Sequence, residues 1–372
     1  MRQEEASPVD LRFLIRAFVK YAASDMHLKP GRPPLYRING KLVAANMDVL
    51  DHAAIKKMIL GILSDARKKE LEEKHQTDFS FRIDEIGRFR CNIFYQRGQL
   101  AAAIRMIPLD IPEIAPLQLP EVVKEICMKP RGLVMITGPT GSGKSTTLAA
   151  MIQYINHHSY VHVLCLEDPI EFIFRDEKAT ITQREIGSDT NSFEEALYAG
   201  LRQDPDVIVV GELRDAATIQ MALTAAETGH LVLATLHTRD AKGSIERIID
   251  VFPQDAKNQI RLQLASVLTA VVSQHLVLKS NGDDQVPTCE ILINSPMIQS
   301  AILKNEIGNI PEIMAKSSEF YKMQTFNQDL ERMIHAGVIT LDEALHVSPA
   351  PEDLRLRISG IVREGGYDIK AG

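Results

Sequence analysis

The chain has 372 residues, of which 45% are hydrophobic and 24% charged, and its formal net charge is −7. The length exceeds one typical hydrophobic core and predicts at least two domains, while the composition is typical of a soluble globular protein. The acidic balance argues against a protein devoted to binding nucleic-acid phosphates.

Membrane and cysteine signals are weak along the chain. The first residues lack a signal-peptide core and no run of about eighteen apolar residues occurs, so we expect a cytoplasmic protein that reaches a membrane only through a partner. Four scattered cysteines without a C-x-x-C pair suggest neither zinc nor disulfides; they are Cys91, Cys127, Cys165 and Cys289.

Residues 1–107 predict an α+β domain with an antiparallel sheet. Ser7 and Pro8 are typical of a helix start, and Asn39-Gly40 is typical of a two-residue hairpin turn. We expect helices at 11–22 and 51–74, and strands at 25–28, 35–44, 78–83, 88–96 and 100–106.

Prolines recur every four residues in the next stretch, at Pro108, Pro112, Pro116 and Pro120. Proline prevents helix and favours an extended backbone, so residues 108–120 are expected to be a stiff linker between domains.

Residues 121–293 alternate helical and apolar strand patterns, which predicts an α/β core with a parallel sheet. Strands are expected at 133–136, 161–166, 207–210 and 231–236, and helices at 192–202, 216–228 and 254–273, followed by a hairpin around Asn281-Gly282. Residues 294–372 are expected to form short helices.

The centre of this core is a phosphate-binding loop of the pattern G-x-x-x-x-G-K-[ST], between a predicted strand and a predicted helix. Glycine reaches the backbone conformations that wrap N–H groups around phosphate oxygens, and the following helix start favours an anion. Lys144 can reach the β and γ phosphates, and the Ser145 hydroxyl can bind Mg²⁺. The loop predicts ATP binding by Gly138, Pro139, Thr140, Gly141, Ser142, Gly143, Lys144, Ser145 and Thr146.

Two glutamates follow predicted strands, at the sheet edge where open α/β proteins bind ligands. Glu212 is expected to act in the water shell of Mg²⁺, and Glu167 to act as the general base that polarises the attacking water. Asp206 precedes its strand and so belongs to the opposite edge. The alternative for each glutamate is helix capping or solvation.

A histidine and three arginines complete the candidates. His237, at the carboxyl end of its strand, either senses the γ-phosphate or is structural, whereas His230 lies at the other end. Arg88, Arg90 and Arg105 lie on strands of the amino-terminal domain, either as a solvated face or as arginine fingers for a neighbouring subunit's nucleotide.

Four segments resemble the secretion-superfamily ATPases. They are 138–145 (Walker A loop), 166–171 (Asp box), 203–214 (atypical Walker B) and 224–237 (His box). Within that superfamily the chain is most similar to the type IV pilus retraction ATPases PilT and PilU, through residues 24–28, 31–34 and 323–326. The ending at 350–356 looks more like PilU.

The resemblance implies a PAS-like amino-terminal domain, a RecA-like P-loop ATPase core and a homo-hexameric ring at an inner-membrane pilus platform protein. It also implies Glu167 as catalytic base, Glu212 as Walker B acid, and arginines reaching the phosphates. The expected function is ATP-driven pilus retraction in twitching motility.

Three alternatives stay open. Lys304 stands where the retraction ATPases carry arginine, so the chain is either a lone motor or an accessory subunit that assists a paralogous ATPase. Pilus-extension or type II secretion ATPases are less favoured, because their four-cysteine zinc motif is missing. A nucleic-acid motor is disfavoured by the acidic balance.

Overall fold

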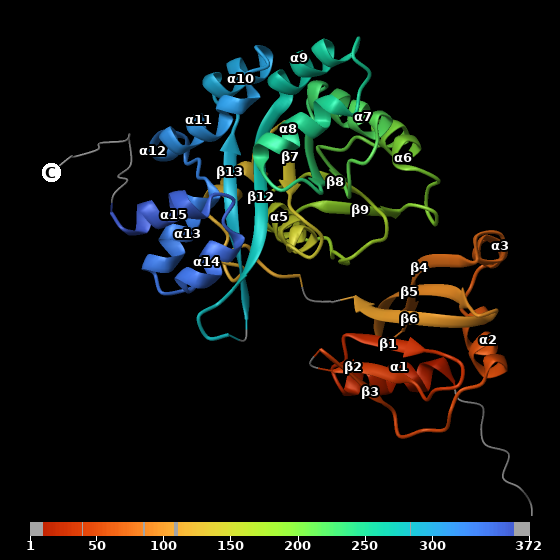
Figure 1. Ribbon diagram of the computed structural model, residues 1–372. Coiled ribbons are helices and arrows are strands. Elements are labelled where there is room, and N and C mark those ends of the chain that lie inside the picture. Colours follow the sequence, from red (N-terminus) through yellow and green to blue (C-terminus); the bar gives the residue numbers. More distant parts are fainter. Residues whose placement is uncertain (1–9, 39, 85, 108–110, 283, 361–372) are drawn as a thin grey trace, which may run out of the picture. The chain divides into compact units, whose positions relative to one another are not determined.

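The computed structural model describes residues 10–360, apart from residues 39, 85, 108–110 and 283 (Figure 1). It divides into two compact units. Unit 1 consists of Met1–Asp110 and Glu171–Ile173, and unit 2 of Ile111–Ile170 and Phe174–Gly372.

Unit 1 has a six-stranded antiparallel sheet in the order β3-β2-β1-β6-β5-β4. The helix α1 begins after Asp10, whose side chain accepts a hydrogen bond from the N–H of Arg12, and its apolar face packs into the core through Leu14 and Phe18. The expected antiparallel α+β structure is confirmed. Its elements are α1 (Leu11–Lys20), β1 (Asp25–Leu28), β2 (Leu35–Ile38), β3 (Lys41–Ala44), α2 (His52–Leu60), α3 (Asp65–Lys74), β4 (Gln76–Ile83), β5 (Gly87–Gln96) and β6 (Gln99–Ile107).

The single helix expected over residues 51–74 is wrong, because α2 and α3 share this stretch. Helix α2 ends at Leu60 with Gly61 as its C-cap, and α3 begins after Ser64, whose hydroxyl accepts a hydrogen bond from the N–H of Arg67 at 3.4 Å. Leu63 between them is buried. The glycine and the capping serine are ordinary stop and start signals, and they outweigh the continuous charge pattern.

Several sequence expectations concern positions outside the described residues: Ser7, Pro8, Asn39 and Pro108. The strands that flank residue 39 do pair antiparallel, and Gly40 has a φ of +78°.

The extended conformation expected for the proline-rich stretch is wrong over residues 114–118. Residues 114–118 form a turn, in which the N–H of Gln118 donates to the carbonyl of Ala115 at 3.0 Å. Ile114 and Leu119 are buried in the core of unit 2. Burial of these apolar side chains selects a turn, which proline also accommodates.

Unit 2 is built on a seven-stranded sheet in the order β13-β12-β7-β11-β10-β8-β9, parallel except for the β12–β13 pair. The expected α/β core is confirmed. Its elements are α4 (Val122–Cys127), β7 (Gly132–Thr137), α5 (Lys144–His158), β8 (His162–Glu167), β9 (Thr180–Glu185), α6 (Phe193–Gly200), β10 (Val207–Val210), α7 (Ala216–Glu227), β11 (Leu231–Leu236), α8 (Ala241–Asp250), α9 (Lys257–Val267), β12 (Leu268–Leu278) and β13 (Gln285–Ile293).

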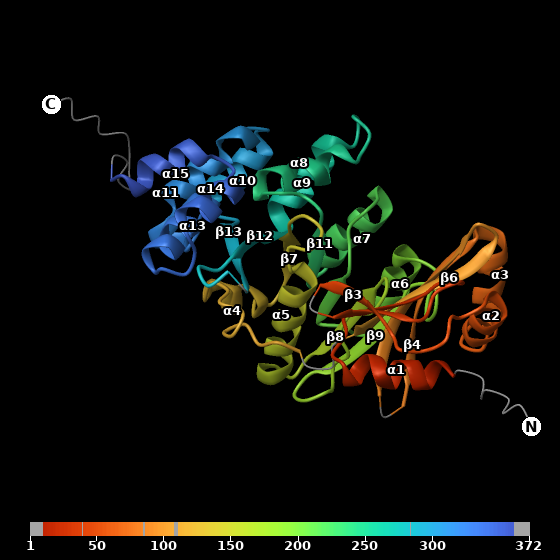
Figure 2. The ribbon, with the colours of Figure 1, turned by 60° about the horizontal axis from the view of Figure 1, so that its bottom comes forward.

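Helices cover both faces of this sheet (Figure 2). Leu133 and Met135 of β7 pack on the side of α6–α9, whereas Val134 and Ile136 pack on the side of α4 and α5. Strands buried on both faces are almost continuously apolar, which makes β10 and β11 recognisable in the sequence.

The helix expected over residues 254–273 is wrong from Leu268 onward. Helix α9 ends at Val267, and β12 begins at Leu268. The stretch that follows is rich in valine, which fits a pleated surface, and pairs with β7 and β13 on its two sides.

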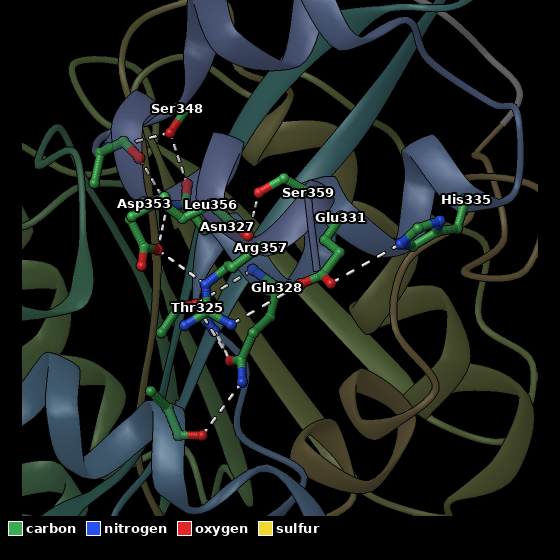
Figure 3. A network of polar contacts seen from close by, with 12 residues as sticks. Thr325, Asn327, Gln328, Glu331, His335, Ser348, Asp353, Leu356, Arg357 and Ser359 are labelled. Carbon is green, nitrogen blue, oxygen red and sulfur yellow. Dashed lines mark hydrogen bonds and ion pairs between the residues drawn. The ribbon is translucent and has the colours of Figure 1, made fainter. Parts of the chain in front are cut away.

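The carboxyl-terminal region is helical, as expected. It comprises α10 (Pro296–Leu303), the 3₁₀ helix η1 (Ile307–Asn309), α11 (Ile310–Lys316), α12 (Ser318–Tyr321), α13 (Phe326–His335), α14 (Leu341–Val347) and α15 (Pro351–Ile358). Figure 3 shows polar contacts that join α13 to α15. Asn327 donates to Asp353 at 2.8 Å, and the Arg357 Nε donates to the same carboxylate at 2.9 Å.

Two simple observations complete the fold. All four cysteines are free and buried. Among the described residues, no helix combines the length and the apolar character needed to span a bilayer.

A buried carboxyl group, that of Glu290 on β13, anchors the start of α8. Its Oε1 accepts a hydrogen bond from the N–H of Ala241 at 2.7 Å, and its exposed fraction is 8%. The pKa of Glu290 is raised from 4.5 to about 7, chiefly by burial and in part by the nearby negative charge of Asp240, against the lowering effect of the Ala241 hydrogen bond.

The raised pKa of Glu290 makes stability depend on pH. Above pH 4.5 the unfolded chain loses this proton while the folded chain keeps it, so stability falls as the pH rises towards 7. We expect Glu290→Gln to match wild type in unfolding free energy near pH 4.5 and to exceed it by about 3 kcal/mol at pH 8. Denaturant unfolding at several pH values measures this, with the exposed Glu194→Gln as control. A constant difference across pH would contradict it.

Candidate active site

Four neighbouring strands bring the expected core residues to one edge of the sheet. The strands β7, β11, β10 and β8 are adjacent and parallel, so their carboxyl ends share an edge. The phosphate loop follows β7, His237 follows β11, Glu212 comes shortly after β10, and Glu167 ends β8. This is the edge at which open parallel sheets bind ligands.

The loop between β7 and α5 has the backbone of a phosphate cradle. The φ angle is +148° at Gly138, +80° at Gly141 and +85° at Gly143, all in the region that favours glycine. Gly143 is the N-cap of α5, and within the described part of the chain no side chain caps this helix. The first N–H groups of α5 can therefore bind an anion.

Lys144 is buried inside this cradle, with an exposed fraction of 7%. Its Nζ donates to the carbonyl oxygens of Gly138 and Pro139, each at 2.9 Å, and lies 3.4 Å from the Nδ1 of His237. The ammonium group thus lies between the loop and the end of β11, where it can stabilise phosphate charge.

A line of side chains continues from Lys144 across the sheet edge. The Nε2 of His237 lies 3.3 Å from one carboxylate oxygen of Glu212, and the Arg214 Nε donates to the other at 2.7 Å. Arg214 also lies 3.8 Å from the carboxylate of Asp168. His237 therefore bridges the lysine of the phosphate loop and the acid that follows β10.

Glu167 is fixed from the neighbouring strand β9. Its Oε1 accepts a hydrogen bond from the Nε2 of Gln183 at 3.0 Å. Gly211 allows the chain after β10 to pass close by, since a Cβ at this position would lie 3.3 Å from the Cα of Glu167. The carboxylate of Glu167 thus belongs to a closely packed part of the edge.

The donor chemistry at this edge suits magnesium. Ser145 and Glu212 offer hydroxyl and carboxylate oxygens, the ligand type that Mg²⁺ prefers, and Mg²⁺ keeps several waters beside substrate phosphates. In the described ranges, no group of three or more His, Cys, Asp or Glu side chains could hold a metal ion. An ion here would need phosphate and water ligands in addition to the protein.

The three candidate arginines lie on one face of the unit 1 sheet. Arg90 on β5 stands directly opposite Arg105 on β6, and Arg88 lies two residues before Arg90. Arg90 donates to Asp78 at 2.8 Å, and Arg105 forms an ion pair of 2.7 Å with Asp25. They belong to unit 1, whereas the phosphate loop belongs to unit 2.

These arginine contacts have electrostatic consequences. Arg88 donates to Ser80 across the β4–β5 pair. Partial burial raises the pKa of Asp25, but hydrogen bonds from Ser24 and Arg105 outweigh burial and hold that pKa below its ordinary value.

Asp206 and His230 each contact main-chain atoms at the opposite edge from the phosphate loop. Asp206 accepts a hydrogen bond from the N–H of His162 at 2.8 Å, at the opposite edge of the sheet as expected. The Nδ1 of His230 lies 2.9 Å from the carbonyl oxygen of Ala225, at the end of α7.

Sequence reasoning missed Gln183, because it missed the whole of β9. This strand has the sequence TITQRE, with one large apolar residue, and gives no period-two pattern. Gln183 lies two residues before the end of β9. Without the strand, the sequence gives no signal that marks this glutamine.

Comparisons with known proteins identify the family of the chain. The family model described as "Type II/IV secretion system protein" matches residues 10–349. The chain belongs to that family.

Relatives in this family cover nearly the whole chain. The type IV pilus retraction ATPase PilT of Pseudomonas aeruginosa is 41% identical over 93% of this chain and 100% of its own length. The type IV pilus ATPase PilU of the same organism is 40% identical over 93% of this chain and 90% of its own length.

A solved structure also has this fold. The crystal structure of the pilus retraction motor PilT with bound ADP superposes with a TM-score of 0.87 at 43% identity, covering 93% of this chain and 99% of that one. The resemblance to the retraction ATPases found in the sequence is confirmed.

Two glycines of the loop provide a matched test of the cradle. A Cβ on Gly138 would lie 2.3 Å from the carbonyl oxygen of Gln274, whereas one on Gly141 would meet nothing within 4 Å. We expect Gly138→Ala to lower ADP affinity by on the order of 100-fold, and Gly141→Ala, strained only by its φ, by about tenfold or less. Calorimetric titration with ADP measures both. Equal losses in the two variants would contradict this geometry.

Proposed function

We propose that this chain is an ATP-hydrolysing motor that powers type IV pilus retraction, in the manner of the retraction ATPases it resembles. The observation that carries the proposal is the order of groups along one sheet edge: the phosphate loop, His237, Glu212 and Glu167. The likeness over nearly the whole length of PilT and PilU supports the specific task.

In this proposal the loop residues 138–146 bind the phosphates of ATP through main-chain N–H groups, and Lys144 stabilises the β and γ phosphates. Glu167 orients a water molecule and takes its proton as the water oxygen attacks the γ-phosphorus. The bond from that phosphorus to the bridging oxygen breaks, and ADP and phosphate are released.

Ser145 and Glu212 are the residues that would hold Mg²⁺, Glu212 through water. The ion when bound would neutralise negative charge on the phosphates. Glu212 also contacts His237, so the position of this carboxylate depends on the imidazole.

His237 is proposed to sense the γ-phosphate. Its ring lies between the ammonium group of Lys144 and the carboxylate of Glu212, 3.4 Å from one and 3.3 Å from the other. A γ-phosphate beside Lys144 would add negative charge on the lysine side of the imidazole and none on the Glu212 side. The contacts of His237 with Lys144 and Glu212 would then change relative to each other.

We further propose a homo-hexamer that works in the cytoplasm at an inner-membrane platform protein. Arg88, Arg90 and Arg105 would act on nucleotide as arginine fingers. Arg90 and Arg105 would then exchange their present partners Asp78 and Asp25 for phosphate. The proposed division of the chain remains 1–107, 108–120, 121–293 and 294–372.

A second candidate is an accessory subunit that assists a paralogous retraction ATPase. Two observations support this candidate: the chain is almost equally identical to PilT and PilU, at 41% and 40%, and it carries lysine at position 304. The two candidates share the same active site and differ in whether the ring retracts pili unaided.

We expect Glu167→Gln and Glu212→Gln each to lower the ATP hydrolysis rate by about 100-fold or more, because the base or the metal-linked acid is lost. Binding of ADP should survive in both, since the cradle is intact. Phosphate release and ADP titration measure these, with the exposed Glu194→Gln as a matched control on α6. Undiminished turnover in both variants would reject the assigned roles.

Complementation of a deletion strain connects the same variants to the task. If the chain is a lone motor, the deletion strain is expected to lose retraction completely. Wild type and Glu194→Gln should restore retraction, and Glu167→Gln should not. Partial or load-dependent loss while the paralogue is present would support the accessory subunit. Unaltered retraction in every strain would contradict both candidates.

A further inference from the structure

One buried amide side chain, that of Gln274 on β12, touches both ends of the phosphate loop. Strand β12 pairs with β7 up to Ser273 opposite Thr137, so Gln274 comes level with the first residue of the loop. Its exposed fraction is 2%. No motif in the sequence marks this residue.

Both polar atoms of the Gln274 carboxamide are used. The Nε2 donates to the carbonyl oxygen of Ser142 at 2.7 Å, and the Oε1 accepts from the hydroxyl of Thr147 at 2.8 Å. Thr147 is itself buried, in the first turn of α5. The side chain thus joins the last part of the loop to the helix that follows.

Gln274 also explains why two loop positions are glycine. A Cβ at Gly143 would lie 2.8 Å from the Nε2 of Gln274, and a Cβ at Gly138 would lie 2.3 Å from its main-chain oxygen. Contacts below 3.0 Å require a shift of one partner. The loop therefore packs against this one residue at both of its ends.

Holding the carbonyl of Ser142 also aims the next N–H group. The peptide bond between Ser142 and Gly143 is planar and trans, so its C=O and N–H point in opposite directions. With the oxygen bonded to Gln274, the N–H of Gly143 points away from β12. A flip of this peptide would bring a carbonyl oxygen into the cradle, and glycine offers little intrinsic resistance to that flip.

We propose that Gln274 is a positioning residue that fixes the Ser142–Gly143 peptide in the orientation that receives phosphate. The inference rests on the proposed binding of nucleotide at this loop. In this proposal Gln274 touches no reacting atom and acts through the main chain of the loop.

The strand that carries Gln274 is well anchored. The next residue, His275, packs against Phe326 of α13 with ring centroids 4.8 Å apart, and Val277 lies in the apolar cluster of α13–α15. A positioning group on a strand held at both ends is more precise than one on a loop.

Three substitutions separate hydrogen bonding from packing. Gln274→Met keeps most of the volume and loses the donor, Gln274→Ala loses both, and Gln274→Glu replaces the donor with an acceptor that faces the Ser142 carbonyl. We expect ADP affinity to fall by about 10- to 100-fold in all three, with Met no better than Ala. Ser273→Ala is the control on the same strand as Gln274: it removes a buried hydrogen bond from Thr137 of β7 and touches no loop residue. Its ADP affinity should stay within about twofold of wild type.

Titration with ADP and thermal unfolding are measured for each variant. Wild-type affinity for Gln274→Met would overturn the proposal in favour of packing, and an equal loss in Ser273→Ala would show a general effect on β12. If a Gln274 variant fails to fold, Thr147→Val is used instead, because it removes the hydrogen bond from Thr147 to Gln274. This variant should lower ADP affinity a few-fold, and unchanged affinity would overturn the proposal. Absence of ADP binding by wild type would instead reject the proposed function.

Discussion

The core depends on the close approach of β12 to the loop between β7 and α5. At Gly138 this approach leaves no room for a Cβ, and at Gly143 it leaves very little. The parallel pairing of β12 with β7 sets this distance, since the pairing ends one residue before the loop begins. A cradle of main-chain N–H groups needs a rigid support behind it, and here the support is β12, a strand paired on both sides.

The sheet order has a second consequence at the same edge. Because β11 and β10 lie between β7 and β8, His237 and Glu212 stand between the phosphate loop and Glu167. Contacts run from Lys144 through His237 and Glu212 to Arg214. A change of charge at the loop can thus reach the neighbouring strand ends through direct contacts.

Sequence predicted the parts of this structure that depend on local spacing. The phosphate loop lies within eight residues, β10 is apolar at every position, and β11 is apolar except at Thr235. Sequence failed where a short apolar run suits both helix and strand, as at the junction of α9 and β12. It also failed for Gln274, because that side chain contacts Ser142 across a separation of 132 residues.

Lys144 gives the most direct test of the central claim, that this cradle holds nucleotide phosphates. The measurement is the dissociation constant for ADP in wild type and in Lys144→Ala, with Lys129→Ala, an exposed lysine outside the loop, as control. We expect an affinity loss on the order of 100-fold for Lys144→Ala and none for Lys129→Ala. Equal affinity in all three proteins would contradict the account.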